Sequence, residues 1–201
     1  MSFGVTSYYC DTCDFEQWDS RVWGRREYFL GEGYSVQLEW DLGWCEDCHG
    51  LAAVEVLSEA QRRAELEKAD SELAALGFRP GPRWWEFPWT WQSKLEKWKE
   101  IAPKAHDAKL ALQLILDRKT PPRCLACGSE HVIAPLETDK SEWIDYSQPK
   151  RIGFLHPGCG GELWKKKSDT RLAFRRSVLL YTPNGQFIKQ NDLETLRTRS
   201  D

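Results

Sequence analysis

Seven cysteines constrain this chain of 201 residues more than any other feature, because six of them form three C-x-x-C pairs. The pairs are Cys10/Cys13, Cys45/Cys48 and Cys124/Cys127, and the seventh cysteine completes the related pair His156-x-x-Cys159. A C-x-x-C turn presents two thiolates to one metal ion, whereas secreted disulfide frameworks are usually spaced differently. The pattern therefore indicates metal ligands in a reducing compartment.

The separation of the pairs along the chain predicts how they combine. Between the first two C-x-x-C pairs lie 31 residues, and between the third pair and His156 lie 28. Because closing a short loop costs less entropy than closing a long one, we expect each pair to join its nearest neighbour. The expected sites are Cys10, Cys13, Cys45 and Cys48 for one ion, and Cys124, Cys127, His156 and Cys159 for the other. Joining Cys10/Cys13 to Cys124/Cys127 is an alternative that closes loops of over a hundred residues.

The flanks of the second set are typical of metal-binding turns, since Gly128 follows Cys127 and Gly160 follows Cys159. These turns resemble the C-x-x-C-G knuckles of zinc ribbons over roughly residues 8–50 and 122–165. The resemblance implies two structural Zn²⁺ ions as cofactors and identifies a module, not a function. At Cys48 the expected glycine is displaced by one position, with His49 between. Iron at the four-cysteine site, unmetallated thiols and His131 as a substitute for His156 remain open.

The pattern along the chain predicts an α+β fold of three parts. Residues 1–53 are expected to form an N-terminal zinc ribbon, with strands at 22–30 and 34–42 around a turn at 31–33. Residues 54–119 have helical spacing over 54–76 and about 93–117, and the Pro- and Trp-rich stretch 79–91 between them reads as a loop. They are expected to form an antiparallel helical hairpin. Residues 120–201 are expected to form a second ribbon with a β-hairpin and a short terminal helix.

Several boundary residues carry specific expectations. Ser58 and Gly77 do not both fit as helix caps, but Gly77, followed by Pro80, is a good helix stop. Pro103 is expected to kink or restart the second helix. The sequence Pro183-Asn184-Gly185 predicts a tight hairpin turn, and Asn191 has the chemistry of an N-cap for the terminal helix.

The net charge of −3 is distributed unevenly. Residues 1–54 carry ten acidic and three basic side chains, whereas residues 120–201 carry ten acidic and thirteen basic ones. Attraction of the whole molecule to nucleic acid is therefore not expected, but a local contact is an alternative function. The candidate nucleic-acid-binding residues are Lys165, Lys166, Lys167, Arg171, Arg175 and Arg176, with Trp164 beside them as a stacking partner. A solvated strand is the simpler interpretation of the same residues.

Eleven tryptophans are an unusual number for a protein of this size. They either fill the core between small ribbons or provide a docking surface for another protein. The candidate docking residues are Trp84, Trp85, Trp89 and Trp91. A protein–protein adaptor or accessory subunit, with two structural zinc sites and another protein as partner, is the function that the sequence favours.

The sequence disfavours an enzyme, and it disfavours a secreted or membrane-spanning protein. A catalytic zinc keeps an open coordination position, but each set here supplies four ligands, and no nucleotide-binding, hydrolase or metalloprotease motif is present. We therefore expect no catalytic residues and a protein that is not an enzyme. The absence of an N-terminal secretory pattern and of a run of about eighteen apolar residues leads us to expect a cytoplasmic protein without a membrane span.

Overall fold

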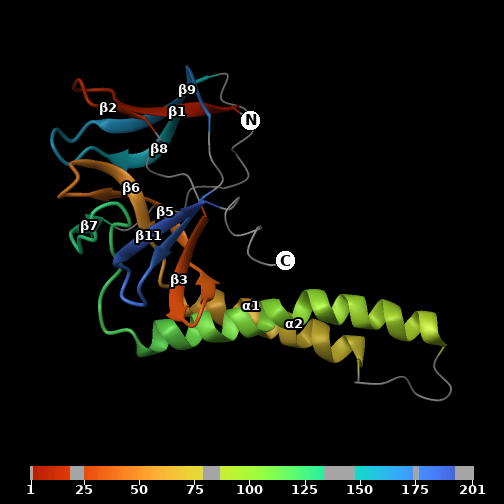
Figure 1. The fold of residues 1–201 in the computed structure, drawn as a ribbon. Helices are drawn as coiled ribbons and strands as arrows, with labels where there is room; N and C mark the ends of the chain where they lie inside the picture. Colours follow the sequence, from red (N-terminus) through yellow and green to blue (C-terminus); the bar gives the residue numbers. More distant parts are fainter. Residues whose placement is uncertain (1, 19–24, 79–86, 134–147, 174–176, 193–201) are drawn as a thin grey trace. The chain divides into compact units, whose positions relative to one another are not determined.

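The computed structural model describes residues 2–18, 25–78, 87–133, 148–173 and 177–192. Its strands are β1 (Ser2–Cys10), β2 (Glu16–Trp18), β3 (Arg25–Gly31), β4 (Tyr34–Gln37), β5 (Trp40–Cys45), β6 (Gly50–Glu55), β7 (Val132–Ile133), β8 (Lys150–Leu155), β9 (Glu162–Ala173), β10 (Ser177–Tyr181) and β11 (Phe187–Asp192). The helices are α1 (Glu59–Leu76) and α2 (Pro88–Asp117). The chain is therefore a mixed α+β protein with small, mainly antiparallel sheets (Figure 1).

The chain divides into two compact units, and these differ from the three parts expected from the sequence. Residues 57–119 form the helical unit, while residues 1–56 and 120–201 together form one β-rich unit. The two cysteine regions therefore do not make two separate ribbons. Strands from both ends of the sequence pair with each other, because β1 lies antiparallel to β9 and β3 lies parallel to β10.

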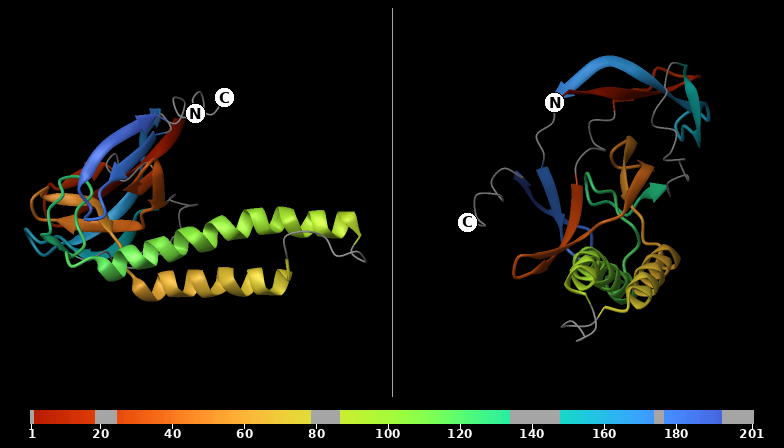
Figure 2. Two further views of the ribbon diagram at one scale, coloured as in Figure 1. Left: turned by 60° about the horizontal axis from the view of Figure 1, so that its bottom comes forward. Right: turned by 90° about the vertical axis from the view of Figure 1, so that its right-hand side faces the viewer.

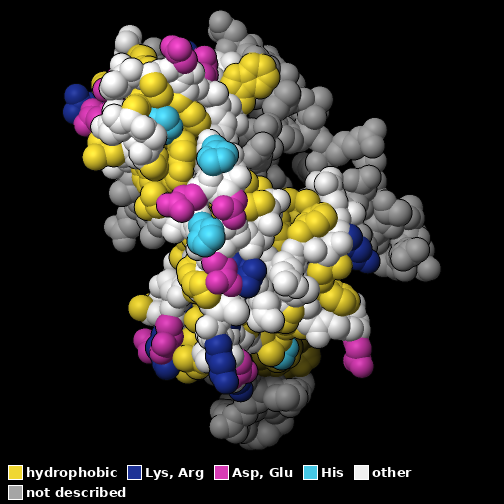
Figure 3. All heavy atoms as spheres, turned by 90° about the vertical axis from the view of Figure 1, so that its left-hand side faces the viewer, with side chains coloured by type: hydrophobic (Ala, Val, Ile, Leu, Met, Phe, Trp, Pro, Cys, Tyr) yellow, Lys and Arg dark blue, Asp and Glu magenta, His cyan; other side chains and the backbone are white. Residues whose placement is uncertain are grey.

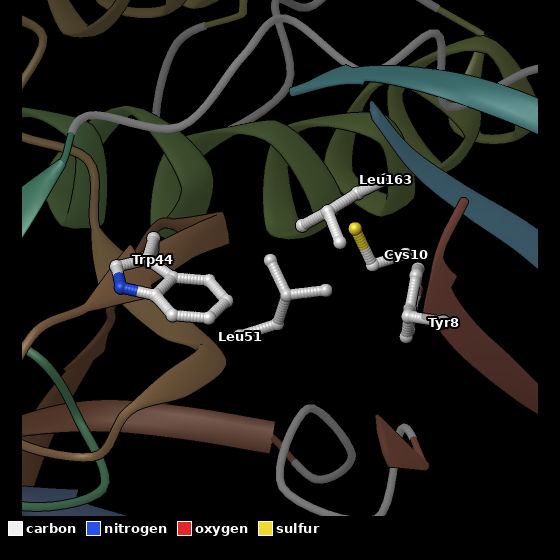
Figure 4. Packing of buried hydrophobic residues seen from close by; sticks show 5 residues of the cluster. All are labelled: Tyr8, Cys10, Trp44, Leu51 and Leu163. Carbon is white, nitrogen blue, oxygen red and sulfur yellow. The ribbon is translucent and has the colours of Figure 1, made fainter. Parts of the chain in front are cut away.

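The described residues of the β-rich unit form three sheets. Sheet A has the order β2-β1-β9-β8, sheet B has the order β11-β10-β3-β4, and sheet C has the order β6-β5-β7. The core between sheets A and C contains Tyr8, Cys10, Trp44, Leu51 and Leu163, all at most 6% exposed (Figure 4). Side chains from both ends of the sequence therefore share one core.

The first predicted hairpin is confirmed, but its second strand is shorter than expected. Positive φ angles of 50° at Glu32 and 81° at Gly33 form the turn between the antiparallel strands β3 and β4. The chain then leaves sheet B at Leu38, which is 1% exposed, and continues as β5 in sheet C. The predicted strand at 34–42 is therefore two strands in different sheets.

The first helix starts later than predicted, because Val54 belongs to β6 and pairs with Asp41. Ser58 is the N-cap and its side chain accepts a hydrogen bond from the Gln61 amide, while Gly77 adopts φ 57° at the other end. The expectation that Ser58 and Gly77 do not both cap this helix is therefore wrong. A start at Glu59 places both residues at caps, where a serine hydroxyl and a left-handed glycine are favoured.

The second helix starts earlier than predicted, at Pro88 in place of about Ser93. A proline fits the first turn of a helix because its missing N–H needs no partner there. Residues 88–91 therefore belong to α2 and not to a loop, whereas residues 79–86 lie outside the described residues. Pro103 lies inside this continuous helix, so it does not restart it.

Aromatic side chains connect the two helices of the helical unit. Helices α1 and α2 lie side by side (Figure 2). The ring of Phe78, just past the end of α1, lies 6.0 Å from Trp91 and 5.5 Å from Trp98. The end of α1 thus contacts the first turns of α2.

The predicted C-terminal hairpin is confirmed, since β10 and β11 are antiparallel and Gly185 has φ 76° in the turn between them. Asn191 lies in β11, so it is not the N-cap of a helix that begins there. Residues 193–201 lie outside the described residues.

Candidate metal centres

All eight predicted ligand residues gather in two clusters, but their pairing differs from the prediction. Site A consists of Cys10, Cys13, His156 and Cys159, and site B consists of Cys45, Cys48, Cys124 and Cys127. Within each site, one ligand atom from every residue lies within 4.8 Å of the others. The predicted union of Cys10/Cys13 with Cys45/Cys48 is therefore wrong, and so is that of Cys124/Cys127 with His156/Cys159.

Strand pairing explains why the nearest neighbours in sequence do not share site A. Strand β1 runs antiparallel to β9, and this register places Cys10 opposite Leu163. The amide of Asp11 donates to the Glu162 carbonyl at 3.1 Å, and the Glu162 amide donates to the Asp11 carboxylate at 2.9 Å. The turn after β1 thereby lies beside the turn between β8 and β9, which carries His156 and Cys159.

Site B forms where the Cys124 turn adds to the β5–β6 hairpin. Cys45 and Cys48 belong to the turn of that hairpin, and Cys124 forms an isolated bridge with Val54. The Leu125 amide donates to the Ala53 carbonyl at 2.9 Å. Strand β7 then pairs with β5, so that Val132 lies opposite Cys45. Backbone pairing in sheet C thus outweighs the entropy of closing the long loop between Cys48 and Cys124.

The donor atoms of site A lie close enough together to bind one metal ion. The Sγ atoms of Cys10 and Cys159 are 3.4 Å apart, and His156 Nδ1 lies 3.3 Å from Cys13 Sγ and 3.1 Å from Cys159 Sγ. Metal–sulfur bonds of about 2.3 Å in a tetrahedron would separate two sulfurs by about 3.8 Å. The backbone amide of Thr12 points to Cys10 Sγ at 3.4 Å and that of Gly161 to Cys159 Sγ at 3.5 Å, as second partners of thiolates.

The imidazole of His156 is held by two aromatic rings. Phe15 stacks on it at 4.8 Å with an interplanar angle of 28°, and Trp44 contacts it edge-on at 5.0 Å and 68°. Both contacts restrict rotation of the imidazole ring while Nδ1 faces the sulfurs of Cys13 and Cys159. Nδ1 is therefore the nitrogen positioned to bind a metal ion.

Site B has the donor atoms of a four-thiolate centre. Its closest pairs are Cys45 Sγ to Cys127 Sγ at 3.5 Å and Cys48 Sγ to Cys124 Sγ at 3.8 Å. Cys45 and Cys124 are fully buried, whereas Cys127 is exposed. Burial raises the pKa of Cys124 to about 11, because a buried thiolate loses its hydration. A bound cation would stabilise the buried thiolate in place of the lost water, and metal binding would release the thiol proton.

Three of the four turns that carry the candidate ligands place the residue after the second ligand in left-handed backbone. Gly128 has φ 79° and Gly160 has φ 74°, and His49 occupies the corresponding position after Cys48 with φ 49°. The turn after Cys48 therefore has the same backbone conformation, although its glycine lies one position later, at Gly50. Gly161 is required for a different reason, since a Cβ atom there would lie 2.6 Å from Cys10 Sγ. The two turns of site A approach so closely that only glycine fits.

Each candidate centre has four protein ligands, which matches a structural site better than a catalytic one. An ion in site A would join residues 10–13 to residues 156–159, and an ion in site B would join residues 45–48 to residues 124–127. Both ions would therefore cross-link a segment that precedes the helical unit to a segment that follows it.

The remaining histidines do not belong to these clusters. His131 Nδ1 lies 3.5 Å from Asp47 Oδ1 at the surface, and hydrogen bonds from Ser129 and His131 lower the pKa of that carboxyl. Figure 3 shows histidine and acidic side chains near one another on one face of the molecule. Among the described residues, only sites A and B group three or more potential ligands.

The candidate binding residues belong to both units and are only partly described. Trp89 and Trp91 lie in the first turn of α2, and Lys165, Lys166 and Lys167 lie in β9. The backbone of Arg171 is in β9, while Trp84, Trp85, Arg175 and Arg176 lie outside the described residues.

The sequence interpretation missed the residues that support the centres. Phe15 and Trp44 pack on His156, and Gln17 joins β2 to β6 through the backbone of Leu51. A signal was present, because Phe15 follows Cys13 by two positions and Trp44 directly precedes Cys45. Aromatic residues next to ligand turns are natural candidates for shielding a metal centre.

The fold and the two clusters define an α+β protein with two candidate metal centres that its distant segments share. Comparison of the chain with family models, curated proteins and solved structures gives no match. Over the described residues, neither helix combines the length and apolar character needed to cross a membrane.

Proposed function

We propose that sites A and B each hold a structural zinc ion and that the protein is a non-enzymatic adaptor or accessory subunit in the cytoplasm. The observation that carries this proposal is the convergence of four donor atoms at each site within 4.8 Å. Three thiolates with one imidazole, and four thiolates, are both common donor sets of structural zinc. Four protein ligands leave no open position for a reacting water or substrate.

The choice of zinc is tested by the metal content of the purified protein. We expect two zinc ions per chain by elemental analysis, with little iron and no visible absorption from iron–thiolate centres. Iron at site B, or a metal content well below two ions per chain, would contradict the proposal. Refolding in the presence of zinc distinguishes metal lost during purification from sites that do not bind it.

The adaptor role is supported by exposed aromatic side chains at the start of α2. Phe87 is 60% exposed and Trp89 is 67% exposed, and their rings stack at 4.8 Å. Large aromatic residues that remain accessible are frequent anchors of protein interfaces. Trp91 differs, since it is partly buried and packs against Phe78. The proposed anchor is therefore Phe87 with Trp89.

The alternative of nucleic-acid binding has weaker support. Lys166 pairs with Glu16 at 3.1 Å and lies 4.9 Å from the centroid of the Tyr9 ring, and Arg151 pairs with Glu162 at 3.0 Å. These carboxylates offset the positive charge on β8 and β9 that a phosphate backbone would need. We therefore rank protein binding above nucleic-acid binding.

A cross-linking experiment separates the two candidate functions. A photoreactive amino acid at position 89 should capture one defined protein in cells, and Phe87→Ala should reduce that capture. Leu116→Ala is the matched control, because Leu116 is 48% exposed near the other end of α2. Salt-sensitive retention on single-stranded nucleic acid, lost in Lys165→Glu with Lys167→Glu, would instead favour the alternative.

A further inference from the structure

Two neighbouring residues of β5 belong to different metal centres. Cys45 is a fully buried member of site B, whereas the ring of Trp44 lies 5.0 Å from the His156 ring of site A. Successive side chains of a strand point to opposite faces, so one rigid strand faces both centres. A shift of β5 would therefore alter both sites at once.

A second connection runs through Gln17 in β2. Its side-chain amide donates to the Leu51 carbonyl at 2.5 Å, and the Leu51 amide donates to the Gln17 Oε1 atom at 2.8 Å. Leu51 lies three residues after Cys48 of site B, and β2 pairs with β1, which ends at Cys10 of site A. The backbone of one ligand turn is thus fixed to the sheet that carries the other centre.

The core between the centres is shared as well. Trp44 and Leu51 of sheet C face Leu163 and Tyr8 of sheet A, together with the ligand Cys10 (Figure 4). Phe15 adds to the contact, since its ring lies 5.3 Å from Trp44 and 4.8 Å from His156. Closely packed interiors transmit displacements, because their side chains cannot move independently.

We propose that sites A and B bind metal cooperatively, with Trp44 as the positioning residue that couples them. An ion in site B fixes Cys45 and hence β5, and Trp44 on that strand then holds the His156 imidazole with Nδ1 toward the sulfurs of site A. By thermodynamic linkage an ion in site A favours site B by the same factor. The inference rests on metal binding at both sites, and it is independent of the adaptor role.

The test uses Co²⁺ and the reduced, metal-free full-length chain. Native mass spectrometry at half saturation counts chains that carry no ion, one ion or two ions. Independent sites leave at least about half of the chains with one ion, whereas a tenfold coupling between equal sites lowers that fraction to about a quarter. We expect a fraction well below half. A fraction of half or more overturns the inference.

Substitutions at Trp44 test its role in the coupling. Trp44→Leu should return the singly loaded fraction to about half or more, and Trp44→Phe should restore the wild-type fraction because it keeps an aromatic ring on His156. Trp40→Leu is the matched control, since Trp40 lies on the same strand and the Arg26 guanidinium lies over its ring, 4.5 Å from the centroid. An unchanged fraction in Trp44→Leu, or loss of coupling in Trp40→Leu alone, contradicts the assignment of Trp44.

A reciprocal pair of ligand variants covers the case in which Trp44→Leu does not fold. Cys13→Ser should weaken Co²⁺ binding at site B at least fivefold, and Cys48→Ser should weaken binding at site A by a similar factor. The ligand-field bands of the four-thiolate and the imidazole-containing centre differ, so the remaining site is identified by its spectrum. Wild-type affinity at the intact site overturns the inference but leaves structural zinc in place. Uptake of fewer than two ions by the wild-type chain would overturn both the coupling and the proposal of two structural zinc sites.

Discussion

The sulfur of Cys10 lies 3.4 Å from the sulfur of Cys159, although 149 positions separate the two residues in sequence. An ion between them would close most of the chain into a loop, and site B would close a second loop inside the first. Cross-links of this kind stabilise a fold chiefly by restricting its unfolded state.

Metal removal is therefore expected to disrupt the side-chain packing of the β-rich unit. A chelator should abolish the near-ultraviolet circular dichroism of Trp44 and its neighbours, while zinc should restore the signal in proportion to bound metal. The helical signal of residues 59–76 and 88–117 should fall much less, because that unit has its own packing. An unchanged near-ultraviolet spectrum in fully metal-free protein would contradict the structural role.

Double substitutions distinguish the observed pairing from pairing of sequence neighbours. Cys10→Ser with Cys159→Ser should remove one ion per chain, because both residues belong to site A. Cys10→Ser with Cys45→Ser should remove both ions. Counting ions by native mass spectrometry decides between the two arrangements, since pairing of neighbours would give the reverse result.

Gly161→Ala is expected to weaken site A selectively. The added methyl group would lie 2.6 Å from Cys10 Sγ and 2.7 Å from Thr12 Cβ. Overpacking costs about 1–3 kcal/mol, which corresponds to a loss of roughly fivefold to 150-fold in metal affinity. Competition with a chromogenic chelator measures this loss. Gly33→Ala is the control: its φ of 81° makes it strained, but nothing lies within 4 Å of the new methyl group, so affinity should not change.

Glu55 should contribute strongly to stability although it is not a metal ligand. Its carboxylate is 1% exposed and accepts hydrogen bonds from Tyr28 Oη at 3.0 Å and from the Arg123 amide at 2.8 Å. Glu55→Ala leaves both donors without this acceptor, at a cost of about 1–3 kcal/mol for each buried group. Urea unfolding of the zinc-loaded protein measures the difference, with the exposed Glu100→Ala as a control near zero. Equal stability of the two variants would refute the role of Glu55.

Tyr181 is expected to make stability depend on pH in the alkaline range. Burial raises its pKa above the ordinary value of 10.0, and its hydroxyl donates to the Leu125 carbonyl at 3.0 Å. Because the folded pKa is the higher one, this contribution is complete below about pH 10 and is lost as the pH rises through the folded pKa. Unfolding experiments between pH 8 and 12 should show the loss.

Tyr181→Phe provides the comparison for that pH dependence. The variant should be less stable than the wild type by about 1 kcal/mol at pH 8, and the difference should shrink at higher pH. A difference that stays constant across the range would show that Tyr181 does not titrate with unfolding.

Local chemistry made much of this structure predictable. The turns at Glu32-Gly33 and at Gly185, the helix stop at Gly77 and the eight candidate ligand residues follow from short patterns. The pairing of the ligands does not, because it depends on β1 meeting β9 and on Cys124 meeting Val54. The entropy of loop closure favours combining ligand pairs that are close in sequence. Strand pairing between distant segments contributes the larger free energy and brings other pairs together.

The missed helix boundaries have a similar origin. Val54 has the spacing of an amphipathic helix with the residues that follow, yet its backbone pairs with Asp41 and its side chain is fully buried. Tertiary burial overrides such a local pattern at the border of two elements. The role of Trp44 was hidden for the same reason, since its contact with His156 exists only after sheets A and C pack.

The Glu55 amide donates to the Arg123 carbonyl at 3.0 Å, so the chain leaves the β-rich unit and re-enters it at almost the same point. Residues 57–119 are thus an insertion whose two stems are already joined by backbone hydrogen bonds. If residues 57–119 were removed, a short glycine-rich linker could connect Val56 to Thr120. The result would be a minimal scaffold into which other domains could be grafted between the same two stems.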